Sequence, residues 1–408
     1  MSTNDLSNNV TLQLGDNTSD NGQDVNNVNN VNNVILNSKS KKIIIRKKGK
    51  TTYKVKNGKS SPVYLFQYID NKNNKYIKDK SEIERIESLR IPPAYQDVII
   101  SKKNTDKVQA IGTDDKGRKQ YIYNPKFIQD NQDNKYKNII KLGYQIEKIK
   151  RNIRETLLEA LKKEYNQWVQ PQTNISIIIF LLDSCNFRIG NIKYLNLYKS
   201  YGASTLKGGH IKMKNGKAHI SFIGKKGVFN SSIVNNSIAN KVFKILKKVK
   251  SKDDILFPHQ NSNEIPITPE QVSDFLKEYD ENIVPKMFRT WYANYYFLEK
   301  IRTDIKNNNE FLVNMLNLGS DYNKMKKRNN NAKENQFQKY KNKYINQCCD
   351  YIAERLHNTS NISKKSYLDH QLADYFFKNT TKFLETIKNN RRISNHQLLI
   401  IIINNMNK

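Results

Sequence analysis

The sequence predicts an α+β fold, in which a small β-rich N-terminal domain precedes a mainly α domain with an inserted three-stranded sheet. Three observations predict this fold. Short stretches between Val63 and Tyr123 alternate apolar and polar residues, as strands with one buried face do. Beyond about residue 131 the apolar residues recur at helical spacing instead. Alternation returns between His210 and Val234, around an Asn215–Gly216 pair that is typical of hairpin turns.

The N-terminal region begins with residues 1–38, which are rich in Asn, Asp and Ser and contain four Asp but no Lys or Arg. They offer too little apolar surface to offset the entropy of ordering, so we expect a disordered, Asn-rich tail. A basic run, KSKKIIIRKKGK, follows from Lys39 to Lys50. It is open to three interpretations: a nuclear signal, an arm that touches DNA, or a strand with charged flanks. We favour the strand.

The β-rich domain is assigned to residues 39–131. Its expected strands include VYLFQYI, DVIIS and KQYIY, which are separated by Asn, Asp, Gly and Pro. One amphipathic helix is expected from Ser81 to Leu89.

The mainly α domain is assigned to residues 132–408. Helices with broad apolar faces are expected from Ile139 to Val169 and from Asn174 to Phe187. After the inserted sheet, helices are expected to continue through Asn358. Within them, the polar stretch from Asn307 to Asn346 is interpreted as an elaborated, solvated linker.

The inserted sheet has two turn signals. Two alternating segments flank Asn215–Gly216, and a second turn, Gly224–Gly227, leads into the segment VFNSSIV. The sequence of the second turn is GKKG, so two lysines lie at the tip of the second hairpin.

Charge is the strongest compositional signal. The net charge is +32 at pH 7, and because residues 1–38 hold no Lys or Arg, the whole positive surplus lies beyond them. Such a surplus favours a polyanionic partner, although a protein from an AT-rich genome that uses Lys and Asn freely gives the same composition. The second possibility leaves function open, so the charge alone identifies no enzyme.

The cysteines and apolar runs indicate the compartment. Cys348 and Cys349 are adjacent and Cys185 stands alone, so neither a disulfide framework nor a CxxC metal site is expected. No signal peptide opens the chain, and the longest apolar run, Leu398 to Ile403, is too short to span a bilayer. We expect an intracellular protein with no membrane partner, or one packaged in a particle made inside a cell.

Motifs for metal or nucleotide chemistry are absent from the sequence. The six histidines form no HExxH motif, no acidic triplet stands out, and there is no Walker lysine loop. If the protein breaks phosphodiester bonds, electrostatic catalysis therefore has to come from cationic side chains rather than from Mg²⁺. We expect no cofactor and no metal.

Four residues have side chains suited to phosphoryl chemistry, and each also has an ordinary structural interpretation. Arg188, after the apolar helix IIIFLLDSCNFR, suits the C-terminal end of a helix dipole. Lys225 suits a solvent-facing turn, Arg289 a buried stem on an aromatic helix, and Tyr367 a helix core. Only the ordered set of Arg, Lys, Arg and Tyr, each in its own sequence context, favours a shared function.

Six motifs together resemble the poxvirus and bacterial branch of the type IB DNA topoisomerases. In chain order they are SLRIPPAYQDVIIS, AIGTDDKGRKQYIYNPKF, FRIGNIKYLNLYKSYGASTLKGGHI, FIGKKG, KMFRTW and SKKSYLDH, from about Ser88 to Tyr367. The resemblance implies a monomeric two-domain clamp around double-stranded DNA. Such an enzyme nicks one strand, lets the free end swivel and reseals the nick without metal or ATP, so supercoils of both signs are relaxed.

The resemblance also implies catalytic roles. Tyr367 matches the nucleophile, which forms a 3′-phosphotyrosyl link and expels a 5′-hydroxyl. Arg188 and Arg289 match two arginines that hold the non-bridging phosphate oxygens, and Lys225 matches the general acid on the hairpin.

A further phosphate donor is implied nine positions before the nucleophile, where the family has a histidine or an asparagine. Counting back from Tyr367 reaches Asn358, and His357 is one place off. We assign Asn358.

DNA-binding residues are implied in both domains. In GRKQYIY, Arg118, Gln120, Tyr121 and Tyr123 match positions that touch phosphates and base edges, and strand alternation places the two tyrosines on one face. After Arg188, Asn191 and Tyr194 match another groove-reading pair, and Lys286 of KMFRTW joins the DNA-binding set. An ordinary polar surface is the alternative interpretation of these residues. Asn191 stands where a lysine can occur, so the resemblance transfers no cleavage preference.

Two other protein classes share part of this pattern. A tyrosine site-specific recombinase uses the same Arg, Lys, Arg and Tyr but normally carries His-x-x-Arg at the second arginine, where this chain has Lys286-Met287-Phe288-Arg289. An architectural DNA binder explains the charge but not the ordered motifs. Asn and Lys richness, with the resemblance, favours a large DNA virus and therefore a virion or the viral factory of a host cytoplasm, with the nucleus also open.

Overall fold

The computed structural model describes residues 43–56, 59–259, 265–310, 312–314 and 331–406. The chain divides into two compact units between Lys135 and Tyr136. The expected tail over residues 1–38 and the first four residues of the basic run lie outside the described residues.

The first unit is built on a six-stranded antiparallel sheet with strand order β3-β2-β1-β4-β5-β6. Its elements are β1 (Ile43–Lys56), β2 (Lys59–Asp70), β3 (Lys75–Tyr76), α2 (Lys80–Ser88), β4 (Gln96–Ser101), β5 (Val108–Thr113) and β6 (Lys119–Tyr123). The strand interpretation of the basic run is confirmed for its residues from Ile43 to Lys50, which belong to β1.

Helix α2 covers one face of this sheet because its apolar residues lie on one side. Ile86 packs in a cluster with Ile44 and Ile100 from the strands, and all three are almost completely buried. Asp79 caps the start of the helix by accepting a hydrogen bond from the Ser81 backbone N–H at 3.1 Å.

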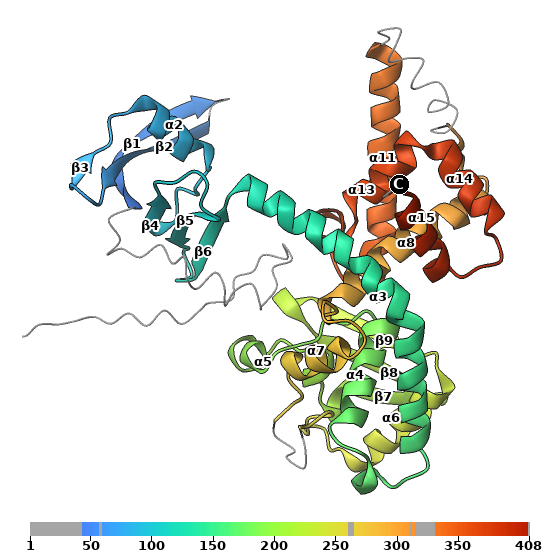
Figure 1. The fold of residues 1–408 in the computed structure, drawn as a ribbon. Helices are drawn as coiled ribbons and strands as arrows, with labels where there is room; N and C mark the ends of the chain where they lie inside the picture. The colour runs from blue at the N-terminus through green and yellow to red at the C-terminus, as the bar shows by residue number, and fades with distance from the viewer. Residues whose placement is uncertain (1–42, 57–58, 260–264, 311, 315–330, 407–408) are drawn as a thin grey trace, which may run out of the picture. The chain divides into compact units, whose positions relative to one another are not determined.

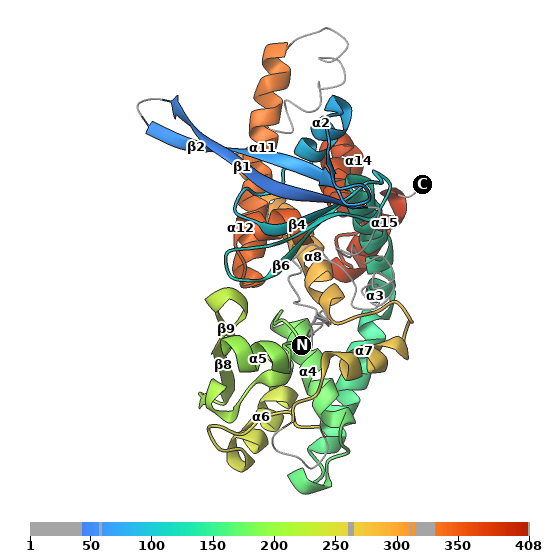
Figure 2. The ribbon, with the colours of Figure 1, turned by 90° about the vertical axis from the view of Figure 1, so that its left-hand side faces the viewer.

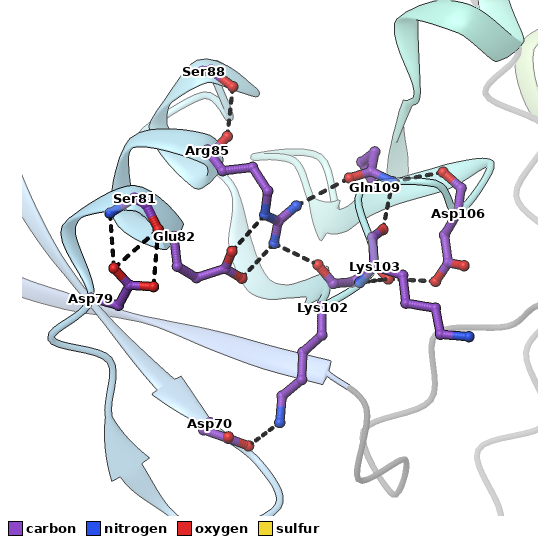
Figure 3. A network of polar contacts seen from close by, with 11 residues as sticks. Asp70, Asp79, Ser81, Glu82, Arg85, Ser88, Lys102, Lys103, Asp106 and Gln109 are labelled. Atoms are coloured by element: carbon purple, nitrogen blue, oxygen red, sulfur yellow. Dashed lines mark hydrogen bonds and ion pairs between the residues drawn. The ribbon is translucent and has the colours of Figure 1, made fainter.

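A polar network fixes the outer side of α2 to the β4–β5 connection (Figure 3). Arg85 binds the carboxylate of Glu82 and donates to the Ser101 carbonyl at 2.8 Å and to Gln109 Oε1 at 3.2 Å. Gln109 in turn donates to the carbonyl of Asp106 at 2.6 Å. The guanidinium is therefore shared by a helix, a strand end and the neighbouring strand, which fixes the turn before β5.

The second unit is mainly helical and contains a three-stranded antiparallel sheet of order β7-β8-β9 (Figure 1). The strands are β7 (Ile211–Lys214), β8 (Lys217–Ile223) and β9 (Phe229–Ile233), and Asn215–Gly216 forms the first turn with both residues at positive φ. Helix α3 (Pro125–Ala160) begins in the first unit and continues into the second. The other α-helices are α4 (Gln172–Ser184), α5 (Ile192–Tyr198), α6 (Ser237–Val249), α7 (Pro269–Lys277), α8 (Lys286–Lys306), α11 (Asn331–Arg355), α12 (Ser360–Ile362), α13 (His370–Lys378), α14 (Thr380–Asn389) and α15 (Asn395–Met406). Single turns are η2 (Tyr165–Gln167), η3 (Ala203–Thr205), η4 (Gly208–His210), η5 (Lys225–Gly227) and η6 (Ser363–Tyr367).

Helix α8 lies at the centre of this unit, packed against α11 and α15 (Figures 1 and 2). Its Trp291 is completely buried in the core cluster. A Cβ atom at Gly143 of α3 would lie 2.3 Å from a Trp291 ring carbon, so the close approach of α3 to α8 requires glycine at this position.

Helix α3 corrects one expectation, because it runs from Pro125 to Ala160 rather than from Ile139 to Val169. Its start carries local signals that apolar periodicity does not contain. Asn124 accepts a hydrogen bond from the Lys126 backbone N–H at 2.8 Å, as an N-cap does, and Pro125 is favourable at the first helical position. Helix α4 likewise ends at Ser184 rather than Phe187, since Asn186 has a φ of 54°.

The polar stretch from Asn307 to Asn346 was interpreted wrongly as a linker where the structure describes its second half. Residues from Asn331 onward form α11. Phe337 and Tyr344 are buried on one side of that helix, and the Tyr344 hydroxyl donates to Asp304 of α8 at 2.9 Å. The polar majority of the sequence is the exposed side of a packed helix.

Among the described helices, none combines the length and the apolar character needed to cross a bilayer.

Candidate active site

Arg289 joins the segments that carry the predicted catalytic residues. It lies on α8 and is 3% exposed. Its Nη1 donates to the carbonyl of Asn186, two residues before Arg188, and its Nη2 donates to the carbonyl of Leu356 at 2.6 Å, two residues before Asn358. Its Nε donates to the Tyr367 hydroxyl oxygen at 3.3 Å. These three acceptors offset part of the free-energy cost of burying the charged guanidinium.

Tyr367 ends the π-helical turn η6 and is 8% exposed. The guanidinium carbon of Arg289 lies 5.1 Å from the centroid of its ring. A guanidinium N–H that points at a phenol oxygen stabilises negative charge as it develops there. The pair is therefore suited to a tyrosine that attacks an electrophile.

Arg188 follows α4 on a segment that turns sharply. Gly190 has a φ of 90°, and a Cβ atom at Gly202 would lie 2.4 Å from the Gly190 backbone nitrogen, so the two loops touch through glycines. The Arg188 carbonyl accepts a hydrogen bond from the Ala203 N–H at 2.8 Å. Its side chain donates from Nη2 to Asn358 Oδ1 at 2.6 Å.

Asn358 and His357 have different surroundings at the end of α11. His357 has a φ of 51°, and the Asn358 N–H donates to the Ala353 carbonyl at 2.9 Å, the arrangement of a Schellman C-cap. Because arginine only donates, its contact fixes the Asn358 oxygen toward Arg188 and the Nδ2 amide on the other side. That Nδ2 is buried and has no hydrogen-bond acceptor among the described residues.

His357 instead faces the end of α4. Its Nε2 lies 3.3 Å from the Cys185 carbonyl oxygen, and its ring lies 5.6 Å from that of Phe187. Burial, followed by the positive charges of Arg289 and Arg188, lowers the pKa of His357 below its ordinary value. The neutral imidazole therefore packs against the protein.

Lys225 lies in η5, the tight turn between β8 and β9. Lys226 and Gly227 both have positive φ, at 62° and 76°. The Phe222 ring, just before the turn, packs edge-on against Phe187 at 4.8 Å between centroids. This contact anchors the hairpin beside the segment that carries Arg188.

Three further predicted residues of this unit lie close in sequence to these groups. Asn191 caps α5 by accepting a hydrogen bond from the Lys193 N–H at 2.8 Å, so its carbonyl oxygen has a structural role. Tyr194 stacks with Tyr198 on the same helix at 6.1 Å. Lys286 begins α8, one helical turn before Arg289.

In the first unit, the predicted DNA-binding residues surround a residue that the motifs did not single out. Asp114 Oδ2 accepts hydrogen bonds from Arg118 Nε at 2.8 Å and from Gln120 Nε2 at 2.9 Å. The Arg118 side chain, with further hydrogen bonds, lowers the pKa of Asp114 to about 2. Tyr121 and Tyr123 stack at 6.2 Å between centroids on the same strand. The spacing of Asp114 four residues before Arg118 was the available signal.

The structure therefore pairs Arg188 with Asn358 and Arg289 with Tyr367 by direct hydrogen bonds. Arg289 links the two pairs through the carbonyls of Asn186 and Leu356, and the Phe187–Phe222 contact anchors the Lys225 turn to the Arg188 segment. The carbonyls of Asn186 and Leu356 could not be predicted, since backbone acceptors carry no sequence signal. Over the described ranges, no group of three or more His, Cys, Asp or Glu is arranged to hold a metal ion.

Two family models match parts of this chain. A family model described as the catalytic core of eukaryotic DNA topoisomerase I matches residues 124–393. A second, described as the N-terminal domain of bacterial DNA topoisomerase IB, matches residues 65–114.

Individual relatives have low sequence identity to this chain, but some of the matches cover most of it. DNA topoisomerase 1B of Acanthamoeba polyphaga mimivirus is 27% identical over 335 residues, covering 80% of this chain and 88% of that protein. DNA topoisomerase 1B of Vaccinia virus (strain Copenhagen) is 27% identical over 237 residues, covering 56% of this chain and 69% of that protein. DNA topoisomerase 1 of Mycosarcoma maydis is 26% identical over 213 residues, covering 46% of this chain and 20% of that protein.

Proposed function

The chain belongs to the type IB DNA topoisomerases, and on that premise we propose that Tyr367 is its nucleophile and that Arg188, Arg289, Asn358 and Lys225 complete the active site. The observation that carries this proposal is the Arg289 guanidinium, which contacts the Tyr367 hydroxyl and holds the backbone beside Arg188 and Asn358.

Cleavage begins when the Tyr367 oxygen attacks the scissile phosphorus in line with the 5′ oxygen of the next nucleotide. The Tyr367 hydroxyl gives up its proton to solvent, the new bond joins phosphorus to the tyrosine oxygen, and the bond to the 5′ oxygen breaks. Lys225 gives its proton to that leaving oxygen, which becomes a 5′-hydroxyl. Religation is the reverse of this step, so the ester keeps the bond energy and no nucleotide is consumed.

The two arginines and Asn358 act on charge that builds on the non-bridging oxygens. Forked guanidiniums suit this role because they offer several N–H groups in fixed geometry. The 2.6 Å hydrogen bond from Arg188 to Asn358 places the guanidinium beside the side-chain amide. Both groups can then donate to one bound phosphate, and the buried Nδ2 of Asn358 supports the second of these hydrogen bonds. Preorganised donors of this kind supply much of the transition-state stabilisation in enzymes.

We further propose that residues 39–131 and 132–408 act as the two halves of a clamp on double-stranded DNA. Arg118 directly precedes β6, and Gln120 and the stacked Tyr121 and Tyr123 lie on it, so polar and aromatic side chains are grouped on one segment of the first half, which supports groove and phosphate contacts there. Asn191, Tyr194 and Lys286 serve the same purpose in the second half. The protein acts as a monomer, and its viral relatives support a site of action inside an infected cell.

Plasmid relaxation tests the proposal. The protein is incubated with positively and with negatively supercoiled plasmid in EDTA and without ATP, and both are expected to relax. Tyr367→Phe removes only the attacking oxygen, so it is expected to bind DNA as the wild type does and to form no covalent adduct. A strict need for Mg²⁺ or ATP, or an adduct formed by Tyr367→Phe, overturns the mechanism.

A further inference from the structure

We infer that Asn294 is a positioning residue for the nucleophile, with Tyr136 as its second support. The inference rests on the proposed role of Tyr367. It concerns the backbone from the Tyr367 carbonyl to the Asp369 N–H, which the proposed catalytic side chains do not hold.

The turn that presents Tyr367 is unusual. The Leu368 N–H donates to the Ser363 carbonyl at 2.9 Å, five residues back, so η6 is a single π-helical turn. Such turns are rare and lie mostly at functional sites, because the wider turn changes the direction of a side chain. After it the backbone becomes extended at Leu368, with a ψ of 129°. The groups that follow Tyr367 therefore need partners outside the helix.

Asn294 provides two of these partners. It lies on α8, is 2% exposed, and its Oδ1 accepts a hydrogen bond from the Asp369 N–H at 2.9 Å. Its Nδ2 donates to the Tyr367 carbonyl at 3.3 Å and to the Thr290 carbonyl at 2.8 Å. The orientation of the amide follows from these partners, since a backbone N–H only donates and a carbonyl only accepts. One amide thus spans the peptide groups before and after Leu368.

Tyr136 binds the Leu368 carbonyl, which lies between the Tyr367 carbonyl and the Asp369 N–H in the chain. From α3, its buried hydroxyl donates to the Leu368 carbonyl at 2.7 Å. Each of the three residues from Tyr367 to Asp369 therefore has a backbone group bound by a buried side chain.

The position of Asn294 on α8 connects its backbone contacts to the proposed catalytic residues. The same helix carries Arg289, whose Nε meets the Tyr367 hydroxyl. Helix α8 therefore fixes both the backbone and the hydroxyl oxygen of the nucleophile. Both are held in place relative to Arg289, the arginine proposed to bind phosphate. A displacement of about 1 Å in a reacting group costs roughly 10²-fold in rate, so losing the backbone contact affects chemistry more than binding.

A core asparagine that only stabilises the fold is the competing explanation, and Asn240 is a matched control for it. Asn240 is 8% exposed on α6. Its Oδ1 accepts from the Ala218 N–H at 2.8 Å, and its Nδ2 donates to the Val234 carbonyl at 2.9 Å. It makes the same two kinds of backbone contact, at the end of the sheet remote from the Lys225 turn. Tyr344→Phe, which removes a hydroxyl bound to Asp304, is the matching control for Tyr136→Phe.

The test is single-turnover cleavage and religation of a duplex by the full chain, with DNA binding measured separately. An unfolded fraction lowers the amplitude of cleavage, whereas a misplaced nucleophile lowers its rate constant. We expect Asn294→Ala to lower the cleavage and religation rate constants by the same factor, about 10- to 100-fold, because both pass through one transition state. DNA binding should stay unchanged, Tyr136→Phe should show a smaller loss in the same direction, and Asn240→Ala and Tyr344→Phe should keep the wild-type rate constants.

Asn294→Asp provides the second variant if the alanine protein does not fold. It keeps the shape and the acceptor for Asp369 but turns a carboxylate oxygen toward the Tyr367 carbonyl, so at neutral pH its rate constants should also fall. The inference is overturned if both Asn294 variants keep wild-type rate constants, or if Asn240→Ala loses as much. Failure of the proposed function gives a different result, namely that the wild type forms no covalent adduct or Tyr367→Phe still forms one.

Discussion

The Nε atom of Arg289 donates a hydrogen bond to the hydroxyl oxygen of Tyr367 at 3.3 Å. The same guanidinium binds the carbonyls of Asn186 and Leu356, so Arg289 has a structural role beside the catalytic role proposed for it. Arg188, by contrast, binds a side-chain oxygen, that of Asn358. The two arginines therefore predict different consequences when each is replaced.

Arg289→Lys should cost both stability and activity. A single ammonium cannot reach two carbonyls and a phenol oxygen from one position, and each buried carbonyl left without a donor costs about 1–3 kcal/mol. We expect unfolding in denaturant to begin at lower concentration and cleavage to slow by about 10²-fold or more. Arg188→Lys should slow cleavage with a smaller loss of stability. Equal losses of stability in the two variants would contradict the scaffold role of Arg289.

Lys225→Ala should slow cleavage because the leaving 5′ oxygen loses its proton donor. A substrate with sulfur in place of that oxygen departs without a proton, so the variant should recover on it. Lys226→Ala is the matched control on the same turn, where Lys226 has a φ of 62°, and it should cleave both substrates as the wild type does. If sulfur restores Lys226→Ala and not Lys225→Ala, the acid has been assigned to the wrong lysine.

Binding to DNA should weaken steeply with salt, because the surplus of positive charge implies many phosphate contacts. If about six phosphates are neutralised, affinity should fall by roughly 10³ between 50 and 200 mM salt. Deletion of residues 1–38, which contain no Lys or Arg, should leave this slope and the relaxation activity nearly unchanged. The measurement is a binding titration at several salt concentrations, and a flat response would contradict the clamp.

His396 should make the second unit less stable in mild acid. It lies on α15 and accepts a hydrogen bond from Trp291 Nε1 at 2.8 Å. Burial, and then the charge of Lys150, lowers the pKa of His396 to about 3. An unfolded imidazole titrates near about 6.5, so below that pH the unfolded state binds a proton that the folded state does not. Stability is complete above about pH 6.5 and falls by up to about 1.4 kcal/mol per pH unit toward the folded pKa.

The measurement for His396 is denaturant unfolding at pH 7.0 and pH 5.5. Tryptophan fluorescence reports on the second unit alone, because both tryptophans of the chain, Trp168 and Trp291, lie in its core. The wild type should lose about 1 kcal/mol between the two pH values beyond what His396→Gln loses. His219→Gln, at a residue on β8 outside this contact, should behave as the wild type. An unchanged pH response in His396→Gln would show that other groups control it.

Local sequence patterns predicted much of the fold. Alternation predicted the strand segments because a half-buried strand repeats every two residues, and Asn215–Gly216 predicted its turn because both residues adopt positive φ readily. The start of α3 was missed because the cap at Asn124 lies in a polar stretch with no apolar periodicity. The part of helix α11 up to Asn346 was missed for a different reason, since its few buried residues are outnumbered by the polar ones on its exposed side.

The site divides in the same way. The catalytic roles proposed for Arg188, Arg289, Asn358 and Tyr367 follow from the resemblance of their motifs to the family, with counting back from Tyr367 used for Asn358. The groups that hold these side chains in place do not stand in recognisable motifs. The carbonyl partners of Arg289 are backbone groups, and Asn294 is one asparagine among many in an Asn-rich chain. Only the fold brings these groups to the nucleophile.

Asn358 should contribute more to cleavage than its neighbour His357. The Asn358 amide is oriented by Arg188, and its buried Nδ2 has no acceptor in the described part of the chain. His357 is the left-handed residue that ends α11, and its ring faces the Cys185 carbonyl. An amide donates to a phosphate oxygen without a protonation equilibrium near neutrality. Asn358→Ala should therefore lose roughly 10² in the cleavage rate constant, as for one oxyanion donor.

His357→Ala should lose much less in cleavage rate, and its main effect should be on stability, because it empties a packed position beside Phe187. The direct measurement is single-turnover cleavage by both variants between pH 5 and 8. The pKa of His357 is lowered by burial, and the amide of Asn358 does not titrate in this range, so the wild-type rate should follow no single ionisation near pH 6 to 7. A larger loss in His357→Ala, or a wild-type rate that follows such an ionisation, would make the histidine the phosphate donor.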